Sequence, residues 1–469
     1  MLTHAAAGLF ADPGLGKTGM TLMALVTLFR QKVASKVLLV APLRVCYSTW
    51  PGEISKWADF NHLRYVVLHG PDKDELLETE ADIYIINPEG LDWLLGVTKT
   101  RKANGKKDVQ VDVRRFKALG FDTLIIDELT KFKNHQSDRW KALKKVLYTF
   151  HRRWGLTGSP AANGLEQLFG QLYVLDEGRS LGSFITHYRN KYFLPAPNGF
   201  GYVLREGADE EIYERVRPLV LRLSALDLLE LPTLVVNDIW VDLPDKARRV
   251  YDPLEDKLVS ELADGSLAVA KTRGVAVGMC RQLAAGAIYK RDEVEALVRL
   301  PRSSREWVEV HDEKLQALTD LLEELEGHQV LIAYEFGHDL ERLRALLGER
   351  ATFVADHPAS QFRALEDAWN QGEVTWLVAQ ASSISHGLNL QQRGNHVVWF
   401  TPPWDKEVYD QLIRRVWRQG SKARRVFVHR LLAKDTTDEA VVAALARKGK
   451  VEQSFFDALQ SARQRRRRI

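Results

Sequence analysis

Short apolar runs alternate with amphipathic stretches through the first third of the chain. The runs are rich in β-branched side chains and are bounded by polar and turn residues, which is typical of buried strands. Buried strands that are separated by helices predict a parallel sheet with helices on both faces. The runs lie at residues 36–42, 65–70, 81–88, 121–128 and 152–160.

A second alternating block starts near residue 311. The leucines of residues 313–325 recur at the spacing of one helix face, and an apolar run follows at residues 329–335. Four further runs predict a second parallel sheet, at residues 351–356, 374–380, 396–400 and 425–432.

The section between the two blocks is mainly helical and charged, with one predicted strand at residues 233–243. We therefore predict an α/β protein that has two parallel-sheet lobes with a helical insertion between them. The predicted domains are lobe 1 at residues 1–175, a helical middle section and linker at residues 176–310, and lobe 2 with a basic C-terminal tail at residues 311–469. A chain of 469 residues is long enough for two or three domains.

The composition is that of a globular protein, with 45% apolar and 27% charged residues. No stretch reaches the roughly 20 apolar residues that span a bilayer, and the first residues lack the basic start of a signal peptide. Cys46 and Cys280 are far apart and belong to no CxxC pair, which argues against a zinc site and fits a reducing compartment. We predict a cytoplasmic protein with no membrane partner.

The net charge of +4 says little about partners, but the basic residues are clustered. They gather at residues 98–107, 414–425 and 463–469. Each cluster alone is also compatible with a solvated face or a disordered end. Three such clusters, in a chain that also has the phosphate-binding motif described next, favour a polyanionic partner.

Residues 11–18, ADPGLGKT, form a variant of the Walker A phosphate loop, with Ala11 where the strict pattern has glycine. The loop backbone would surround phosphate, the lysine would reach the β- and γ-phosphates, and the threonine would bind Mg²⁺. The predicted cofactor-binding residues are Gly14, Leu15, Gly16, Lys17 and Thr18. A glycine-rich turn that binds no ligand is the alternative.

An acidic pair ends the predicted strand at residues 121–128. Asp127 stands where a Walker B carboxylate would hold Mg²⁺, and Glu128 would polarise the attacking water. An acidic pair in this place also occurs as a helix cap. The upstream GKT makes the catalytic interpretation the stronger one.

Two arginines in lobe 2 are candidates for the charge that stabilises phosphoryl transfer. Arg415 and Arg418 are three residues apart and are expected on one helix face, from which they would act across a cleft as arginine fingers. A basic helix that faces DNA or solvent is the alternative. A GTPase is disfavoured, because the nearest match to its purine-reading motif, NKYF at residues 190–193, lacks the aspartate.

In order along the chain, these motifs resemble those of helicase superfamily two, and most closely its Swi/Snf branch of double-stranded DNA translocases. The matching segments are ADPGLGKT (11–18), LLVAPLRVCYSTWPGEISKW (38–57), DELTKFKN (127–134), LTGSPAANGLEQLF (156–169), LRLSALDLLELPTLVVNDIWVDL (221–243), HGLNL (386–390) and WDKEVYDQLIRRVWRQG (404–420). The resemblance covers nearly the whole chain. The compact chain resembles a phage or mobile-element member of the branch, which implies that it acts in bacterial or phage-infected host cytoplasm.

The resemblance implies two RecA-like lobes, with ATP and Mg²⁺ as cofactors and double-stranded DNA as a largely sequence-independent partner. Gln411 would face the nucleotide, while Gly387 and Asn389 would couple the nucleotide to DNA. Pro42, Thr157 and Ser159 lie on motifs that line the path of one DNA strand in this family. A recruiting protein is not identified by any segment.

Several positions depart from the Swi/Snf pattern. Thr130 replaces a histidine, Ile384 and Ser385 replace paired glycines, and Ser421 replaces a glutamine. A glutamine that reads adenine is expected upstream of the phosphate loop, and residues 1–7 contain none. Either the natural chain begins further upstream or adenine is held by packing alone. In both cases we expect GTP to be hydrolysed within about two orders of magnitude of ATP, since an apolar slot discriminates by only about 1–3 kcal/mol.

The sequence thus predicts a DNA-stimulated ATPase that translocates along duplex DNA and remodels protein–DNA complexes. Hydrolysis is a firmer expectation than efficient stepping, because the departures lie on the path between ATP and DNA. A strand-separating DNA or RNA helicase and a nucleic-acid-binding scaffold without turnover are the alternatives.

Overall fold

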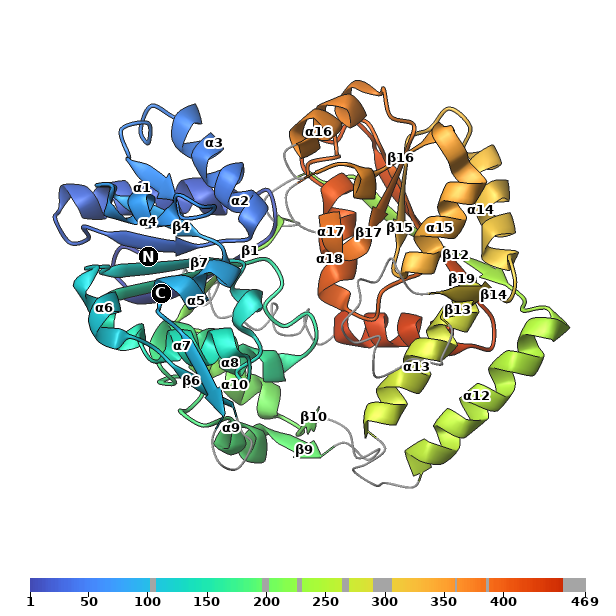
Figure 1. The fold of residues 1–469 in the computed structure, drawn as a ribbon, viewed down its shortest axis with the longest axis horizontal. Helices are drawn as coiled ribbons and strands as arrows, with labels where there is room; N and C mark the ends of the chain where they lie inside the picture. Colours follow the sequence, from blue (N-terminus) through green and yellow to red (C-terminus); the bar gives the residue numbers. More distant parts are fainter. Residues whose placement is uncertain are drawn as a thin grey trace, which may run out of the picture. The chain divides into compact units, whose positions relative to one another are not determined.

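The computed structural model describes residues 1–101, 107–195, 202–225, 230–263, 270–289, 306–358, 361–384 and 388–449. These residues form two compact units (Figure 1). The described residues of the first unit run from Met1 to Ala225, and those of the second from Glu230 to Gly449. Within the described parts of the chain, no helix is long and apolar enough to cross a membrane.

The first unit is built on a parallel sheet of seven strands. All five strands that the sequence predicts for lobe 1 belong to it, and β1 and β11 are added at one side. The strand order is β11 (Val220–Leu223), β1 (Ala6–Ala11), β8 (Arg152–Thr157), β7 (Thr123–Asp127), β2 (Val37–Val40), β4 (Ile83–Ile86) and β3 (Tyr65–Val67).

Helices cover both faces of this sheet, as the continuous apolar runs predict. Neighbouring side chains on each strand point to opposite faces, so Leu39 and Ile125 pack into one core while Leu38 and Leu124 pack into the other. The first core lies under α1 (Lys17–Arg30) and α3 (Thr49–Lys56). The second lies under α5 (Leu91–Leu94), α6 (Val113–Ala118), α7 (Asp138–Lys144), α8 (Leu168–Asp176), α9 (Ile185–Tyr192) and α10 (Ala208–Val216).

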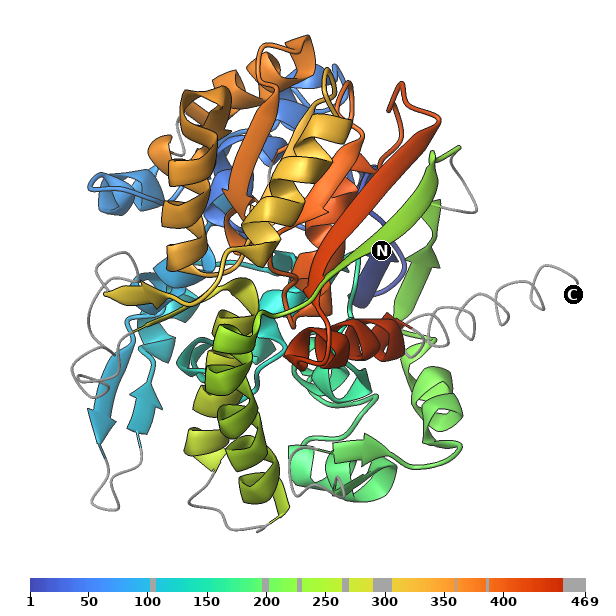
Figure 2. The same ribbon diagram turned by 90° about the vertical axis from the view of Figure 1, so that its right-hand side faces the viewer.

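The second unit is built on a parallel sheet of six strands. Its order is β12 (Thr233–Val241), β19 (Arg425–Ala433), β18 (His396–Trp399), β15 (Val330–Tyr334), β17 (Trp376–Gln380) and β16 (Ala351–Phe353). Figure 2 shows β12 and β19 side by side, and they pair over nine residues each. The two parallel sheets therefore confirm the predicted α/β fold of two RecA-like lobes.

Helices again lie on both faces of the second sheet. One core is formed with α14 (Glu313–Glu324) and α15 (Gly337–Leu347), and the other with α16 (Phe362–Gln371), α17 (Ala381–Ile384) and α18 (Lys406–Val416). A smaller core joins the end of β12 to α12 (Asp245–Ala263) and α13 (Ala270–Ala285).

The segment at residues 176–310, predicted as a helical middle section, contributes to both sheets. Its strand β11 pairs with β1 in the first unit, whereas β12 pairs with β19 in the second. Both strands form parallel pairs with partners about 200 residues away, which a local hydrophobic pattern does not reveal.

Three antiparallel strand pairs extend from the units. They are β5 (Thr98–Arg101) with β6 (Lys107–Gln110), β9 (Phe193–Pro195) with β10 (Tyr202–Leu204), and β13 (Ala287–Tyr289) with β14 (Trp307–Glu309). The first pair carries part of the basic cluster at residues 98–107. The basic tail at residues 463–469 lies outside the described residues.

Candidate functional site

The phosphate loop joins the end of β1 to the start of α1. Gly14 and Gly16 have φ values of 90° and 76°, in the left-handed region that glycine adopts without strain. A Cβ built on Gly16 would meet no atom within 4 Å, so the space beside this residue is open. The loop therefore leads directly into the N-terminus of α1 with an approachable backbone, which suits an anion.

The side chain of Lys17 folds back over this loop. Its Nζ donates to the carbonyl of Ala11 at 2.6 Å and lies 3.4 Å from the carbonyl of Asp12. Lys17, Thr18 and Leu15 are half-buried, whereas Gly14 and Gly16 are exposed. The cationic group is thus held at the loop that the sequence predicts to bind phosphate.

Asp12 fastens the base of the loop to the edge strand β11. Its carboxylate accepts hydrogen bonds of 2.9 Å from the guanidinium of Arg222 and from the backbone N–H of Ala225. Both charged side chains are buried, and the guanidinium also donates to the carbonyls of Phe10 and Leu223. Removal of either partner of such a buried ion pair is strongly destabilising, because it leaves the other charge buried and unpaired. No sequence motif predicts this pair.

The acidic pair lies at the same edge of the sheet as the phosphate loop. The strands β1, β8 and β7 are neighbours and parallel, so their carboxyl ends meet at one edge, where α/β proteins bind ligands. Asp127 ends β7, and its carboxylate accepts a hydrogen bond of 2.9 Å from the indole of Trp50.

Burial raises the pKa of Asp127 to about 6, and the charge of Glu128 adds to this effect. The Trp50 hydrogen bond and the positive charge of Lys17 act in the opposite direction and lower that pKa. Lys17 and Asp127, predicted from motifs about 110 residues apart, therefore interact electrostatically in the folded protein.

Glu128 has an unusual backbone conformation, with φ 68° and ψ 66°. This left-handed conformation in a residue other than glycine costs of order 1–3 kcal/mol and is common at functional sites. Its Oε1 accepts hydrogen bonds from the hydroxyls of Thr130 at 2.7 Å and Thr157 at 3.2 Å. Thr130, which departs from the histidine of the Swi/Snf pattern, is thus a partner of this carboxylate.

The residues that were expected along a DNA strand differ in exposure. Thr157 is buried, and its hydroxyl is directed to Glu128. Ser159 is buried as well, and its backbone N–H donates to the Thr157 hydroxyl at 3.3 Å. Pro42 is half-buried at the start of α2 (Leu43–Tyr47).

In the second unit, Arg418 and Asn389 come together. The Arg418 guanidinium donates to Oδ1 of Asn389. The backbone N–H and side-chain amide of Asn389 donate to the Glu366 carboxylate at 2.8 and 3.2 Å. Burial lowers the pKa of Arg418, and the charge of Glu366 opposes this shift. Glu366 was missed because it lies in α16, outside every recognised motif.

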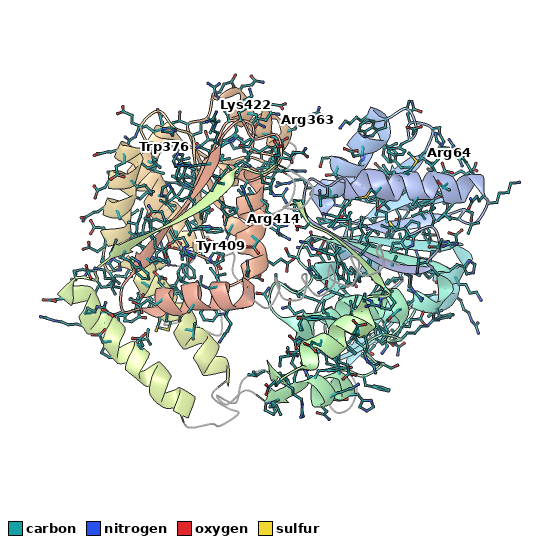
Figure 3. All side chains as sticks on the ribbon, turned by 180° about the vertical axis from the view of Figure 1, so that it is seen from behind. Arg64, Arg363, Trp376, Tyr409, Arg414 and Lys422 are labelled. Atoms are coloured by element: carbon teal, nitrogen blue, oxygen red, sulfur yellow. The ribbon has the colours of Figure 1, made fainter. Side chains whose placement is uncertain are left out.

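Arg415 occupies the last turn of α18, next to Arg414 (Figure 3). Its guanidinium donates to the carbonyls of Gln411 and Leu388 at 3.3 and 3.4 Å, and Gln411 itself is buried. The expectation that Arg415 and Arg418 share one helix face is wrong, because α18 ends at Val416.

Arg418 instead follows the helix end and is placed by Asn389. Ile384 is buried at the end of α17, and Ser421 accepts a hydrogen bond of 3.3 Å from the backbone N–H of Ala423. Gly387 and Ser385 lie outside the described residues.

The residues of the first unit fit ATP and Mg²⁺. A helix N-terminus, an open glycine turn and a lysine amine form a suitable phosphate site. Hydroxyl and carboxylate oxygens, as in Thr18 and Asp127, are the ligands that Mg²⁺ prefers.

Two family models match this chain. The model described as SNF2-related domain matches residues 3–283, and that described as Helicase conserved C-terminal domain matches residues 313–420. The chain belongs to the SNF2-related family. The family assignment confirms the resemblance to the Swi/Snf branch of helicase-like ATPases.

Relatives of this SNF2-related protein come from a phage and from cellular organisms. "Putative protein p41" of Acyrthosiphon pisum secondary endosymbiont phage 1 is 33% identical over 96% of this chain and 94% of its own length. "Protein CHROMATIN REMODELING 25" of Arabidopsis thaliana and human "DNA excision repair protein ERCC-6-like" are each 25% identical over 92% of this chain. The chain spans 50% and 38% of these two proteins.

Among solved structures, the chain is similar to the "Sulfolobus solfataricus SWI2/SNF2 ATPase core in complex with dsDNA". The match includes 98% of this chain and 91% of the solved chain, at 20% identity and a TM-score of 0.41.

Proposed function

We propose that this SNF2-related protein is a DNA-stimulated ATPase that translocates along double-stranded DNA and remodels protein–DNA complexes. The observation that carries the proposal is the meeting of Lys17, Asp127 and Glu128 at one edge of the first sheet. These groups supply a phosphate contact, a metal ligand and a base for water, which are the parts that ATP hydrolysis requires.

Each side chain has a proposed role. Lys17 binds the β- and γ-phosphates together with the backbone of Gly14, Leu15 and Gly16. Thr18 and Asp127 hold Mg²⁺, which would supply charge neutralisation at the phosphates. The Glu128 carboxylate orients the attacking water and takes its proton.

The hydroxyls of Thr130 and Thr157 fix the Glu128 carboxylate in place. In the second unit, Arg415 and Arg418 supply positive charge to the transferred phosphoryl group. Gln411 and Gly387 complete the proposed nucleotide-binding set.

DNA is the proposed partner on three grounds. The relatives include proteins named for chromatin remodelling and DNA excision repair. Basic clusters occur at residues 98–107 and 414–425. Pro42, Thr157, Ser159 and Asn389 belong to motif segments that resemble those lining the DNA path in this family, although Thr157 and Ser159 themselves are buried. Contacts of this kind are made to phosphates, so binding is proposed to be independent of sequence and sensitive to salt.

A strand-separating helicase is the second candidate. It is favoured by the match of residues 313–420 to the helicase C-terminal model and by a relative named "Uncharacterized ATP-dependent helicase" in Mycoplasma pneumoniae, 24% identical over 96% of this chain. The two candidates differ in the nucleic acid that stimulates hydrolysis and in whether strands part.

Phosphate release measured with no nucleic acid, duplex DNA, single-stranded DNA and RNA in parallel tests the proposal. We expect the greatest stimulation by duplex DNA, with no strong dependence on its sequence. Stimulation by RNA or single strands alone would favour the helicase. The absence of turnover under all four conditions would favour a binding scaffold.

A further inference from the structure

The indole of Trp50 contacts the carboxylate of Asp127 directly. Trp50 lies in the first turn of α3, which follows β2 and the short helix α2, and its side chain is 0% exposed. Its Nε1–H donates to Oδ2 of Asp127 over 2.9 Å. The two residues are 77 positions apart in sequence, so the contact is made by the tertiary fold.

This contact differs from those of three other buried tryptophans in the described parts of the chain. Trp140, Trp154 and Trp369 donate their indole N–H groups to the backbone carbonyls of Gly170, His4 and Leu390. A backbone carbonyl satisfies a buried indole without involving any functional group. Trp50 is directed instead to a carboxylate at the edge of the sheet that carries the phosphate loop.

An indole is chemically suited to hold a metal-binding carboxylate. It is neutral, so it fixes one oxygen of the carboxylate without neutralising the charge that a cation requires. An arginine or lysine in the same place would compete with the metal for that charge. Hydrogen-bond donors of this kind orient the ligands of metal sites, and their loss typically costs about 10–100-fold in metal affinity or activity.

Besides the Trp50 indole, a backbone hydrogen bond of Glu128 acts on the Asp127 carboxylate. Cys46 lies nearby in the same core, and its thiol donates to the carbonyl of Ala41 at 3.2 Å. Burial raises the pKa of this thiol to about 12, with the Asp127 charge as a further cause, so it remains protonated and uncharged. Trp50 is therefore the neutral side-chain donor that the structure provides to this carboxylate.

We propose that Trp50 is a positioning residue, whose indole N–H holds the Asp127 carboxylate in the orientation that binds nucleotide-associated Mg²⁺. This inference rests on the proposed ATPase function and adds to it a residue that touches neither nucleotide nor metal. Loss of the indole donor should therefore weaken Mg²⁺ binding and leave the phosphate loop intact.

The test is a Mg²⁺ titration of the binding of a fluorescent ATP analogue to the full chain. Trp50→Phe removes the donor, and Trp140→Phe is the matched control, because Trp140 is a buried tryptophan of the same unit at 5% exposure whose donor serves Gly170. We expect Trp50→Phe to require about 10–100-fold more Mg²⁺ for half-maximal binding. Nucleotide affinity in EDTA should match that of the unsubstituted protein, and Trp140→Phe should titrate as that protein does.

A smaller ring also leaves a cavity, so a second replacement separates packing from hydrogen bonding. Benzothienylalanine at position 50 keeps the shape of tryptophan and lacks the N–H group. The same shift in Mg²⁺ requirement supports the inference, and this replacement decides the matter if Trp50→Phe does not fold. An unchanged Mg²⁺ requirement in the benzothienyl protein overturns it. If the unsubstituted chain binds nucleotide without any Mg²⁺ dependence, the proposed function itself fails, which is a separate result.

Discussion

The hydroxyl of Thr157 donates a hydrogen bond of 3.2 Å to the carboxylate of Glu128. Thr157 ends β8 and Glu128 follows β7, so the bond joins the ends of two neighbouring strands. Thr130 donates to the same oxygen at 2.7 Å. The candidate base is therefore held by two hydroxyls while its own backbone is in a left-handed conformation.

Removal of the Thr157 hydroxyl should slow ATP turnover. Hydrogen bonds to charged groups contribute about 1.5–3 kcal/mol, so Thr157→Val is expected to lower kcat about 10–100-fold with little change in nucleotide affinity. Thr123→Val is the control, because Thr123 is buried at the opposite end of β7 and donates to Asp122. Equal kinetics of the two variants would contradict a role of the Thr157 hydroxyl in holding the Glu128 carboxylate.

Lys17→Ala and Glu128→Gln should both abolish measurable turnover but differ in binding. The lysine change removes a phosphate contact and is expected to weaken ATP binding. Glutamine keeps the volume of Glu128 and still accepts the two hydroxyl bonds, while general-base catalysis worth about 10²–10⁴-fold is lost. ATP should therefore bind Glu128→Gln normally and accumulate unhydrolysed in a single-turnover assay. Near-normal turnover in this variant would assign the base elsewhere.

Arg415→Ala and Arg418→Ala should impair hydrolysis more than DNA binding. Arginine fingers contribute about 10³–10⁵-fold to the rate in related enzymes. Arg414→Ala is the matched control for hydrolysis at saturating DNA, because this arginine precedes Arg415 in the same turn of α18 (Figure 3). The measurement is kcat at saturating duplex DNA beside DNA affinity with a non-hydrolysable analogue. Lost affinity with normal saturated turnover would indicate a DNA-gripping role.

A pair of histidines should make the stability of the second unit depend on pH. His396 is buried, and its Nδ1 lies 3.1 Å from Nε2 of His429. Burial lowers the pKa of His396 to about 4, with the charges of His429 and His328 as further causes. The unfolded pKa is about 6.5, so the unfolded chain takes up the proton first, and stability is lost as pH falls from about 6.5 to about 4.

We expect the free energy of unfolding to fall by about 2 kcal/mol between about pH 7.5 and about pH 5, because pH 5 lies about 1.5 units below the unfolded pKa and one pKa unit corresponds to about 1.4 kcal/mol. Urea unfolding at about pH 7.5 and about pH 5 measures the loss. His396→Asn should reduce the difference, whereas the same change at exposed His151 should not. An undiminished difference in His396→Asn would contradict the assignment.

The hydrophobic pattern predicts the strands of both sheets that are buried on two faces. Runs such as residues 36–42 and 121–128 contain successive apolar residues, at positions 37–41 and 124–126, because helices cover these strands on both sides. The edge strand β11 has the mixed sequence Val-Leu-Arg-Leu, and its arginine is explained only by Asp12 more than 200 residues away. Patterns along the chain carry no information about such partners.

The candidate site shows the same division. Short motifs were sufficient to predict Lys17, Asp127 and Glu128 as site residues, since each motif consists of one strand and the turn that follows it. The supporting contacts of Trp50 and Glu366 come from tertiary packing, and no local motif contains both partners. The end of α18 at Val416 could likewise not be predicted from the sequence, because Trp417 and Arg418 are both compatible with a helix.

Displacement of a third strand from a blunt DNA duplex measures translocation along the duplex directly, because a motor that moves along the duplex removes the third strand in its path without separating the other two. We predict ATP-dependent displacement by the unsubstituted chain, no displacement with a non-hydrolysable analogue or with Glu128→Gln, and an intact duplex at the end. Robust duplex-stimulated hydrolysis without displacement, or separation of the duplex strands, would contradict this prediction.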